Sequence, residues 1–422
     1  MAGDGGFKLI KAARVIDGNG GPPIERGAVL IEGDKVRAVG SEESVTAPEG
    51  VHVEEHVYEN QTVLPGLVDG HVHLIGIGDG RAGDELTTLP DEILTLQAAR
   101  NARAHLYSGV TTVRDCGAKN QTTLMLRQAM EMGITVGPKL VLAGRPIAII
   151  GGHLNYFGTT ATGTVEGRAA VRQLVKEGVD FIKVTATGGS TRTSIASRPS
   201  FTMEEIRAIA DEAHKFGIHV AAHCTNTEGI RNAVDGGVDT VIHGTHHEPD
   251  GSVVYDPELS EQMAKNDIFL NPTIHQARER IWQLEEMAKT RLLTEEEQAS
   301  VDKYNSKWEE DVAYWARVRA DGVTLIAGSD ASWMWYKLGG TSFQDEILAH
   351  SDIGMTPMEA IVSGTRDSAR SSWVEDEVGT LEAGKQADVL VVDGDPSQDV
   401  KALRNVVDVF QGGNVVDRSG VI

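Results

Sequence analysis

Short β-branched segments alternate with longer segments of helical period over residues 65–371, and this rhythm constrains the fold more than any other feature. It is typical of repeated βα units, in which each strand is followed by a helix that packs on a parallel sheet. Eight such units over about 300 residues predict an α/β fold of the (β/α)₈, or TIM, barrel type. The expected strands are 67–73, 110–115, 139–144, 180–187, 219–224, 239–244, 268–273 and 324–330.

An open, doubly wound sheet is the alternative for the same rhythm. It is disfavoured by the count of eight units and by the lack of a GxGxxG turn after the first expected strand. One connection, residues 275–320, is too long for a simple βα loop and is rich in helix formers and in charges of both signs. We expect a helical insertion there, which extends over the barrel mouth, contacts another subunit of a homo-oligomer, or simply exposes a solvated face.

The two ends of the chain follow a different pattern. Residues 1–64 and 372–422 contain short segments of alternating apolar residues, separated by Gly or Asp-Gly turns. Because chain ends often lie close together, we expect both to form one small composite β-sandwich domain beside a barrel domain at 65–371.

Composition excludes several classes of protein. The net charge of −23 disfavours binding to nucleic acid or to an anionic membrane surface. The two cysteines, Cys116 and Cys224, form no CxxC pair, which excludes a disulfide scaffold or a zinc ribbon and fits a reducing compartment. Neither a signal-peptide pattern nor an 18-residue apolar run is found. We therefore expect a cytoplasmic protein whose partner is a small-molecule substrate, with no nucleic acid and no membrane.

Six polar side chains fall near the carboxyl ends of the expected strands, the face that carries barrel active sites. Two of them form an HxH pair, and on a strand both imidazoles point to the same side. Lys183 lies in an otherwise apolar strand, where an ammonium is costly to bury. Taken singly, Asp330 could cap a helix and Lys183 could extend to the barrel mouth. Together the six predict a metal site: His71, His73, Lys183, His223, His243 and Asp330.

Two segments resemble signatures of the amidohydrolase superfamily. LPGLVDGHVHL (64–74) is similar to its first-strand motif, and LEAGKQADVLVVDGDP (381–396) to its closing β-sandwich motif. Within the superfamily the chain resembles the imidazolonepropionase-related binuclear-zinc prolidases (Xaa-Pro dipeptidases) and the carboxypeptidase-like dipeptidases. The motifs that carry this second resemblance are GGHLNYFG (151–158), KVTATGGSTRTS (183–194) and HGTHHE (243–248).

The resemblance implies a role for each of the six polar residues. His71 and His73 would bind a buried metal, and His223 and His243 a more exposed one. Lys183, carbamylated by CO₂, would bridge the two, and Asp330 would bind the buried metal and shuttle protons. The chemistry agrees, because an ammonium has no lone pair for a cation, whereas a carbamate offers one oxygen to each metal. Imidazole and oxygen ligands favour two Zn²⁺, with Mn²⁺ or Co²⁺ as possible substitutes.

The expected reaction is hydrolysis of the amide bond before a C-terminal amino acid of a dipeptide, most of all Xaa-Pro. A metal-bridging hydroxide would attack the carbonyl while Asp330 moves the proton. Such a substrate has a free carboxylate, for which an arginine is the preferred holder. By motif resemblance we expect Arg192 to bind it, with His153 and Tyr156 as further contacts and His153 also catalytic. The alternatives are N-acyl amino acids, aryl amides with an amino-acid leaving group, and dipeptides with other C-terminal residues.

Other residues near the strand ends lie outside the expected metal site. The alternative of a non-catalytic protein with this barrel predicts the loss of at least one metal ligand, whereas all six expected ligands are present. Ser329 has no His–Asp relay spacing that would make it a nucleophile, and Cys224 is expected to point into the barrel wall. His246 and His247 are expected to face solvent, with a place for one of them behind the metal ligands as the alternative, whereas His275 could face the mouth. Three aromatic residues could line a side-chain pocket or pack on the barrel rim: Trp333, Trp335 and Tyr336.

Overall fold

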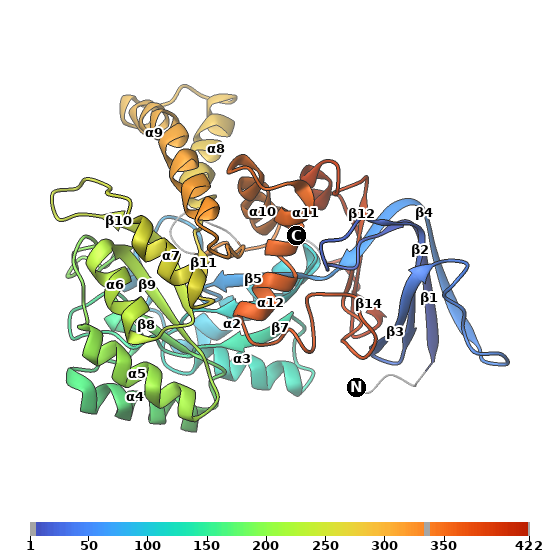
Figure 1. Ribbon diagram of the computed structural model, residues 1–422, viewed down its shortest axis with the longest axis horizontal. Helices are drawn as coiled ribbons and strands as arrows, with labels where there is room; N and C mark the ends of the chain where they lie inside the picture. Colours follow the sequence, from blue (N-terminus) through green and yellow to red (C-terminus); the bar gives the residue numbers. More distant parts are fainter. Residues whose placement is uncertain (1–5, 333–337, 421–422) are drawn as a thin grey trace.

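The computed structural model describes residues 6–332 and 338–420, and it shows a barrel beside a smaller β-domain (Figure 1). Trp333, Trp335 and Tyr336 lie outside the described residues. Seven of the expected barrel strands are present and form two parallel sheets. These strands are β5 (Leu67–Val72), β6 (Val110–Asp115) and β7 (Lys139–Leu142) in one sheet, and β8 (Ile182–Thr185), β9 (Val220–Asn226), β10 (Thr240–His247) and β11 (Phe269–Asn271) in the other.

The eighth expected strand, 324–330, is an extended segment rather than a regular strand. It nevertheless pairs with a strand on each side: Ile326 N donates to Leu270 O at 2.9 Å, and Asp330 N donates to His71 O at 2.7 Å. The segment therefore joins β11 to β5. The two sheets are also joined between β7 and β8. Ile147, in the segment after β7, donates its backbone N–H to the carbonyl oxygen of Lys183 in β8 at 2.8 Å. The (β/α)₈ prediction is confirmed.

Helices cover the outside of the barrel, as the amphipathic segments between the strands predict. Their ends follow local rules: Thr202 and Glu205 form a capping box at the start of α5, and Gly178, at φ 89°, ends α4 in the left-handed region that glycine tolerates. The outer helices are α2 (Asp91–Tyr107), α3 (Thr122–Glu131), α4 (Gly163–Glu177), α5 (Met203–Lys215), α6 (Thr227–Gly236), α7 (Pro257–Lys265), α10 (Ser342–Asp352), α11 (Pro357–Ser363) and α12 (Arg366–Ser371).

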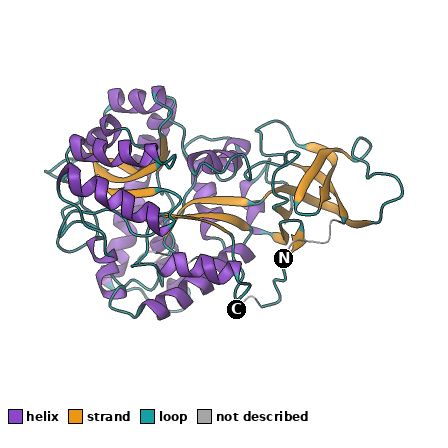
Figure 2. Cartoon of the chain, turned by 90° about the horizontal axis from the view of Figure 1, so that it is seen from below, coloured by secondary structure: helices purple, strands orange, loops and turns teal. Residues whose placement is uncertain are grey.

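Both chain ends build one seven-stranded sheet, in the order β14-β13-β12-β4-β1-β2-β3. Figure 2 shows this strand-rich domain beside the helix-covered barrel. Antiparallel pairing of β12 with β4 joins the two ends, and buried residues such as Val63, Val389 and Phe410 form the core of this domain. The predicted composite β-sandwich is therefore confirmed. Its strands are β1 (Phe7–Val15), β2 (Ile24–Glu32), β3 (Lys35–Ser41), β4 (Val53–Pro65), β12 (Val389–Asp393), β13 (Val406–Gln411) and β14 (Asn414–Val415).

The long connection after β11 folds into two helices, α8 (Gln276–Ala288) and α9 (Glu295–Ala320), which project together from the barrel (Figure 1). α9 begins with a capping box between Thr294 and Glu297. Of the helices in the described parts of the chain, none is long and apolar enough to cross a membrane.

Candidate active site

One cavity of about 500 Å³ opens at the carboxyl ends of the barrel strands. It is lined by all six residues of the expected metal site and by His153. The six residues come from five different strands or strand extensions, far apart in the sequence, so only the closed barrel brings them together. They are His71, His73, Lys183, His223, His243 and Asp330.

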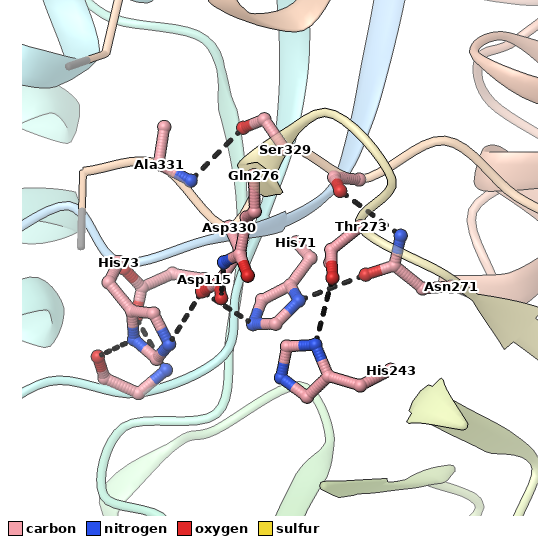
Figure 3. Close-up of polar contacts among 12 residues, drawn as sticks. His71, His73, Asp115, His243, Asn271, Thr273, Gln276, Ser329, Asp330 and Ala331 are labelled. Carbon is pink, nitrogen blue, oxygen red and sulfur yellow. Dashed lines mark hydrogen bonds and ion pairs between the residues drawn. The ribbon is translucent and has the colours of Figure 1, made fainter. Parts of the chain in front are cut away.

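Three of these residues converge on one point (Figure 3). Asp330 Oδ1 lies 3.3 Å from His71 Nε2 and 3.4 Å from His73 Nε2. All three side chains are buried, and their ligand atoms are close enough together to hold one metal ion. Among the described residues, neither His71 Nε2 nor Asp330 Oδ1 has a hydrogen-bond partner. Since buried polar atoms are almost always paired, these two orphaned atoms fit a metal site.

Hydrogen bonds at the far side of each ring point the Nε2 atoms toward Asp330. His73 Nδ1 donates to the carbonyl oxygen of Gly117 at 2.8 Å, and His71 Nδ1 lies 2.9 Å from Asn271 Oδ1. The Asn271 amide nitrogen donates to two backbone carbonyls, so its oxygen faces the imidazole and His71 Nδ1 donates to it. Both Nε2 atoms therefore keep their lone pairs for a metal.

Replacing Asn271 with alanine is expected to weaken metal binding by about 10- to 100-fold, because His71 loses the partner that fixes its tautomer and ring orientation. Equilibrium dialysis against a zinc buffer measures the effect. Asn232→Ala is the matched control. Asn232 lies on the outer helix α6, and its side chain donates a hydrogen bond to the Phe201 carbonyl, so its loss should leave zinc affinity unchanged. Equal zinc affinity in Asn271→Ala and the parent protein would contradict this positioning role.

His223 and His243 lie side by side, with ring centroids 4.8 Å apart. His243 Nδ1 is hydrogen-bonded to Thr273 Oγ1 at 2.8 Å, again leaving Nε2 available. His223 Nε2 donates to the Gly188 carbonyl at 3.0 Å, so this ring keeps its lone pair on Nδ1. Burial lowers the pKa of both imidazoles well below the usual value, which keeps them neutral as metal ligands must be.

Lys183 is only 1% exposed, and its ammonium forms no hydrogen bond or ion pair within the described chain. Burial lowers its pKa, and the nearby Cys116 and Asp330 oppose that effect. Burial likewise raises the pKa of Asp330 to about 7. A lysine without partners in the floor of a cavity, beside four histidines and a carboxylate, has no structural role that explains it.

The backbone is strained where these ligands are presented. His243, Thr273 and Asp330 have φ values of 65°, 50° and 53°. These values lie in the left-handed region, which residues other than glycine, asparagine and aspartate rarely adopt. Strain of this kind persists only where the surrounding structure imposes it, and it concentrates at functional sites.

A second buried carboxylate, that of Asp69, holds the strand ends together. It accepts hydrogen bonds from Ser329 N at 2.9 Å and Ser329 Oγ at 2.6 Å, and it lies 2.9 Å from His105 Nε2. Ser329 is thus a structural partner of Asp69, in agreement with the lack of a nucleophile pattern around it.

The residues expected to contact substrate are not all brought to the cavity. His153 lines it, with its ring centroid 4.4 Å from that of His223. A Cβ at Gly189 would lie 2.7 Å from the His153 ring, so glycine allows this packing. Tyr156 instead packs against Phe157 and the hydrophobic core. Arg192 is 83% exposed, and its Nε lies 3.0 Å from Asp84, outside the cavity lining.

Three histidines and a cysteine near the strand ends lie in different surroundings. The prediction for His246 is wrong: its side chain is buried, with Nδ1 2.8 Å from the Tyr314 hydroxyl, because α9 covers the strand end that would otherwise be open to solvent. His247 is partly buried. His275 is buried against Glu279, away from the cavity lining. Cys224 is buried in the barrel wall as expected.

The insertion contributes four lining residues on one helix that were not expected from the sequence. All lie on α9 of the insertion, which therefore forms one wall of the cavity: Lys307, Trp308, Asp311 and Trp315. Trp308, Asp311 and Trp315 have the i, i+3, i+7 spacing of a single helix face, the one signal that could have found them. Gln276, at the start of α8, also lines the cavity and donates a hydrogen bond to Asp330 Oδ2.

Residues 62–416 match the model of the amidohydrolase family, and the chain belongs to this family. Membership and the hydrolases among its relatives make it an enzyme that hydrolyses amide bonds. The recognition made from the two signature motifs is thereby confirmed.

Similar proteins include several hydrolases. A solved Xaa-Pro dipeptidase with bound methionine in its active site is 29% identical, with a TM-score of 0.80 over 97% of this chain and 99% of that one. A prolidase in complex with N-methylphosphonate-L-proline is 25% identical, with a TM-score of 0.79 and the same coverage. Ochratoxinase from Aspergillus niger is 25% identical over 98% of this chain and 87% of its own length.

Proposed function

We propose that this enzyme is a binuclear metal hydrolase that cleaves the amide bond before a C-terminal amino acid, with Xaa-Pro dipeptides as the favoured substrates. The observation that carries the proposal is the convergence of His71 Nε2, His73 Nε2 and Asp330 Oδ1 in a buried cavity, two of these atoms being without hydrogen-bond partners. His223 and His243 would hold a second ion, and Lys183, carboxylated on Nζ, would bridge the two. Zinc suits these nitrogen and oxygen ligands best.

Bound metal ions would supply a water of lowered pKa and polarise the substrate carbonyl. Asp330 is placed to take a proton from the attacking water and deliver it to the leaving nitrogen. Gln276 donates to Oδ2 of Asp330, which leaves Oδ1 toward the two histidines. His153 lines the same cavity and would contact the substrate.

The prolidase reading is supported by the two solved relatives that act on, or bind, proline compounds. A second candidate has support from the cavity itself. Trp308 and Trp315 give it an aromatic wall, which suits an N-acyl amino acid or an aryl amide with an amino-acid leaving group, as well as dipeptides ending in an apolar residue.

A dipeptide library tests these candidates on zinc-reconstituted protein, with substrates grouped by C-terminal residue and N-acyl amino acids included. We expect turnover with a marked preference for Xaa-Pro, and loss of turnover on dialysis against a chelator with recovery on adding zinc. Preference for basic or apolar C-terminal residues would identify a carboxypeptidase-like dipeptidase. Turnover of N-acyl amino acids alone would favour the second candidate, and no turnover of either group would refute the proposal.

A further inference from the structure

The α8–α9 insertion is fixed to the barrel at a point next to the cavity. Arg278 of α8 donates to Asp352 of α10 at 2.5 Å, and its guanidinium stacks over the Trp308 ring of α9 at 3.9 Å from the ring centroid. Trp308 is in turn part of the cavity wall. The wall formed by α9 is therefore held in place from outside the cavity rather than left as a loose flap.

Among the described residues of the lining, this wall carries the one accessible cation, Lys307. Among the lining residues that the structure describes, the cationic side chains are Lys183 and Lys307, and Lys183 is buried at the metal site. Lys307 is 45% exposed, with its Nζ 3.5 Å from Asp311 Oδ1. This ion pair is long and solvent-exposed, and its lysine lies N-terminal to the acid on the helix, so it contributes little to stability. A substrate carboxylate could therefore take the place of Asp311 as the partner of Lys307 at little cost in free energy.

Asp311 faces the same cavity and is half-buried. Burial raises the pKa of its carboxyl, with Lys307 opposing that effect. A substrate carboxylate that reached Lys307 would therefore meet an ammonium whose ion pair with Asp311 is weak. Arg192, by contrast, is already engaged with Asp84 at 3.0 Å outside the lining.

From this arrangement we infer that Lys307 binds the free carboxylate of the substrate, and that Trp308 and Trp315 beside it accept an apolar group at the same end. This inference rests on the proposed function in taking the substrate to be an amide with a free carboxylate. It makes the insertion the part of the chain that selects the substrate, and it replaces Arg192 by Lys307 as the carboxylate holder.

The test compares binding of N-acetyl-L-leucine with binding of its uncharged amide, N-acetyl-L-leucinamide, by calorimetry on zinc-reconstituted protein. We expect the parent protein to bind the acid at least about tenfold more tightly than the amide, as for a charge-assisted contact. Lys307→Met should remove this preference without weakening amide binding, and Lys307→Arg should keep most of it. Asp311→Asn, which releases Lys307, should strengthen acid binding.

Lys303→Met is the matched control, since Lys303 is an exposed lysine one turn earlier on α9 and is not part of the cavity lining. It should retain the full preference for the acid. Loss of the preference in Arg192→Met with its retention in Lys307→Met would overturn the inference, as would a parent protein that binds acid and amide equally. Because the readout is binding, it is independent of the library assay: a protein that turns over neither substrate group yet shows a Lys307-dependent preference refutes the proposed function alone.

Discussion

Lys183→Ala is expected to lose bound zinc and to lower turnover by about 10³-fold or more, which corresponds to the several kcal/mol of transition-state stabilisation that a bound metal supplies. Lys183 is 1% exposed and has no hydrogen-bond partner within the described chain. Its removal therefore deletes packing contacts but no polar contact between side chains of the described residues. What it would delete is the proposed anionic bridge between two metals. Zinc content by mass spectrometry and kcat on an Xaa-Pro dipeptide measure the two effects.

Unfolding of the variant would also lower activity, and a second substitution separates the two explanations. Lys183→Met keeps the volume and removes a charge from an apolar strand, so the metal-free variant should be as stable to denaturant as the metal-free parent, or more so. Its zinc content should nevertheless be as low as that of Lys183→Ala. Added acetate or propionate, whose carboxylate could enter the space left by Lys183→Ala, is expected to restore part of the activity. Two metals and full turnover in either variant would show that the bridge is wrong.

The fold could be predicted because its signals are local. Each βα unit is encoded by a short alternation of β-branched and helical segments, and the barrel follows from repeating it. The strand-end position of His71, Lys183 and His243 could be predicted for the same reason, since parallel strands place their carboxyl ends at one face. The segment 324–330 shows the limit: its pairing with β11 and β5 was predictable, but not its irregular geometry, with Asp330 at φ 53°.

What could not be predicted depends on contacts between distant residues. Asn271 is 200 residues from His71, yet its side chain fixes the orientation of that imidazole. The position of α9 over the cavity depends on Arg278 stacking on Trp308 and binding Asp352, which no sequence period encodes. The direction of the Arg192 side chain depends on such a contact too, because its partner Asp84 lies 108 residues earlier. A motif can indicate the loop on which a residue lies, but not the direction in which its side chain points.

Asp330→Asn is expected to lower kcat on amide substrates by about 10²- to 10⁴-fold, the usual contribution of a proton-transferring group. The substitution is nearly isosteric, and asparagine is one of the few residues that tolerate the left-handed conformation that Asp330 adopts at φ 53°. The amide can still accept a hydrogen bond and offer an oxygen to a metal, but it cannot carry a proton. Asp388→Asn is the matched control, since Asp388 is another buried aspartate, located in the β-domain with Gly412 N as its donor.

A metal-binding role alone would also lower kcat, and the leaving group distinguishes the two roles. An amide nitrogen must be protonated before it departs, whereas the alkoxide of the corresponding ester can leave without prior protonation. If Asp330 delivers the proton, Asp330→Asn should slow the dipeptide far more than its ester analogue at matched zinc content. Equal losses on both substrates would mean that Asp330 only holds the metal. The proton would then have to reach the nitrogen from another group, and His153 is a titratable side chain of the lining outside the proposed ligand set.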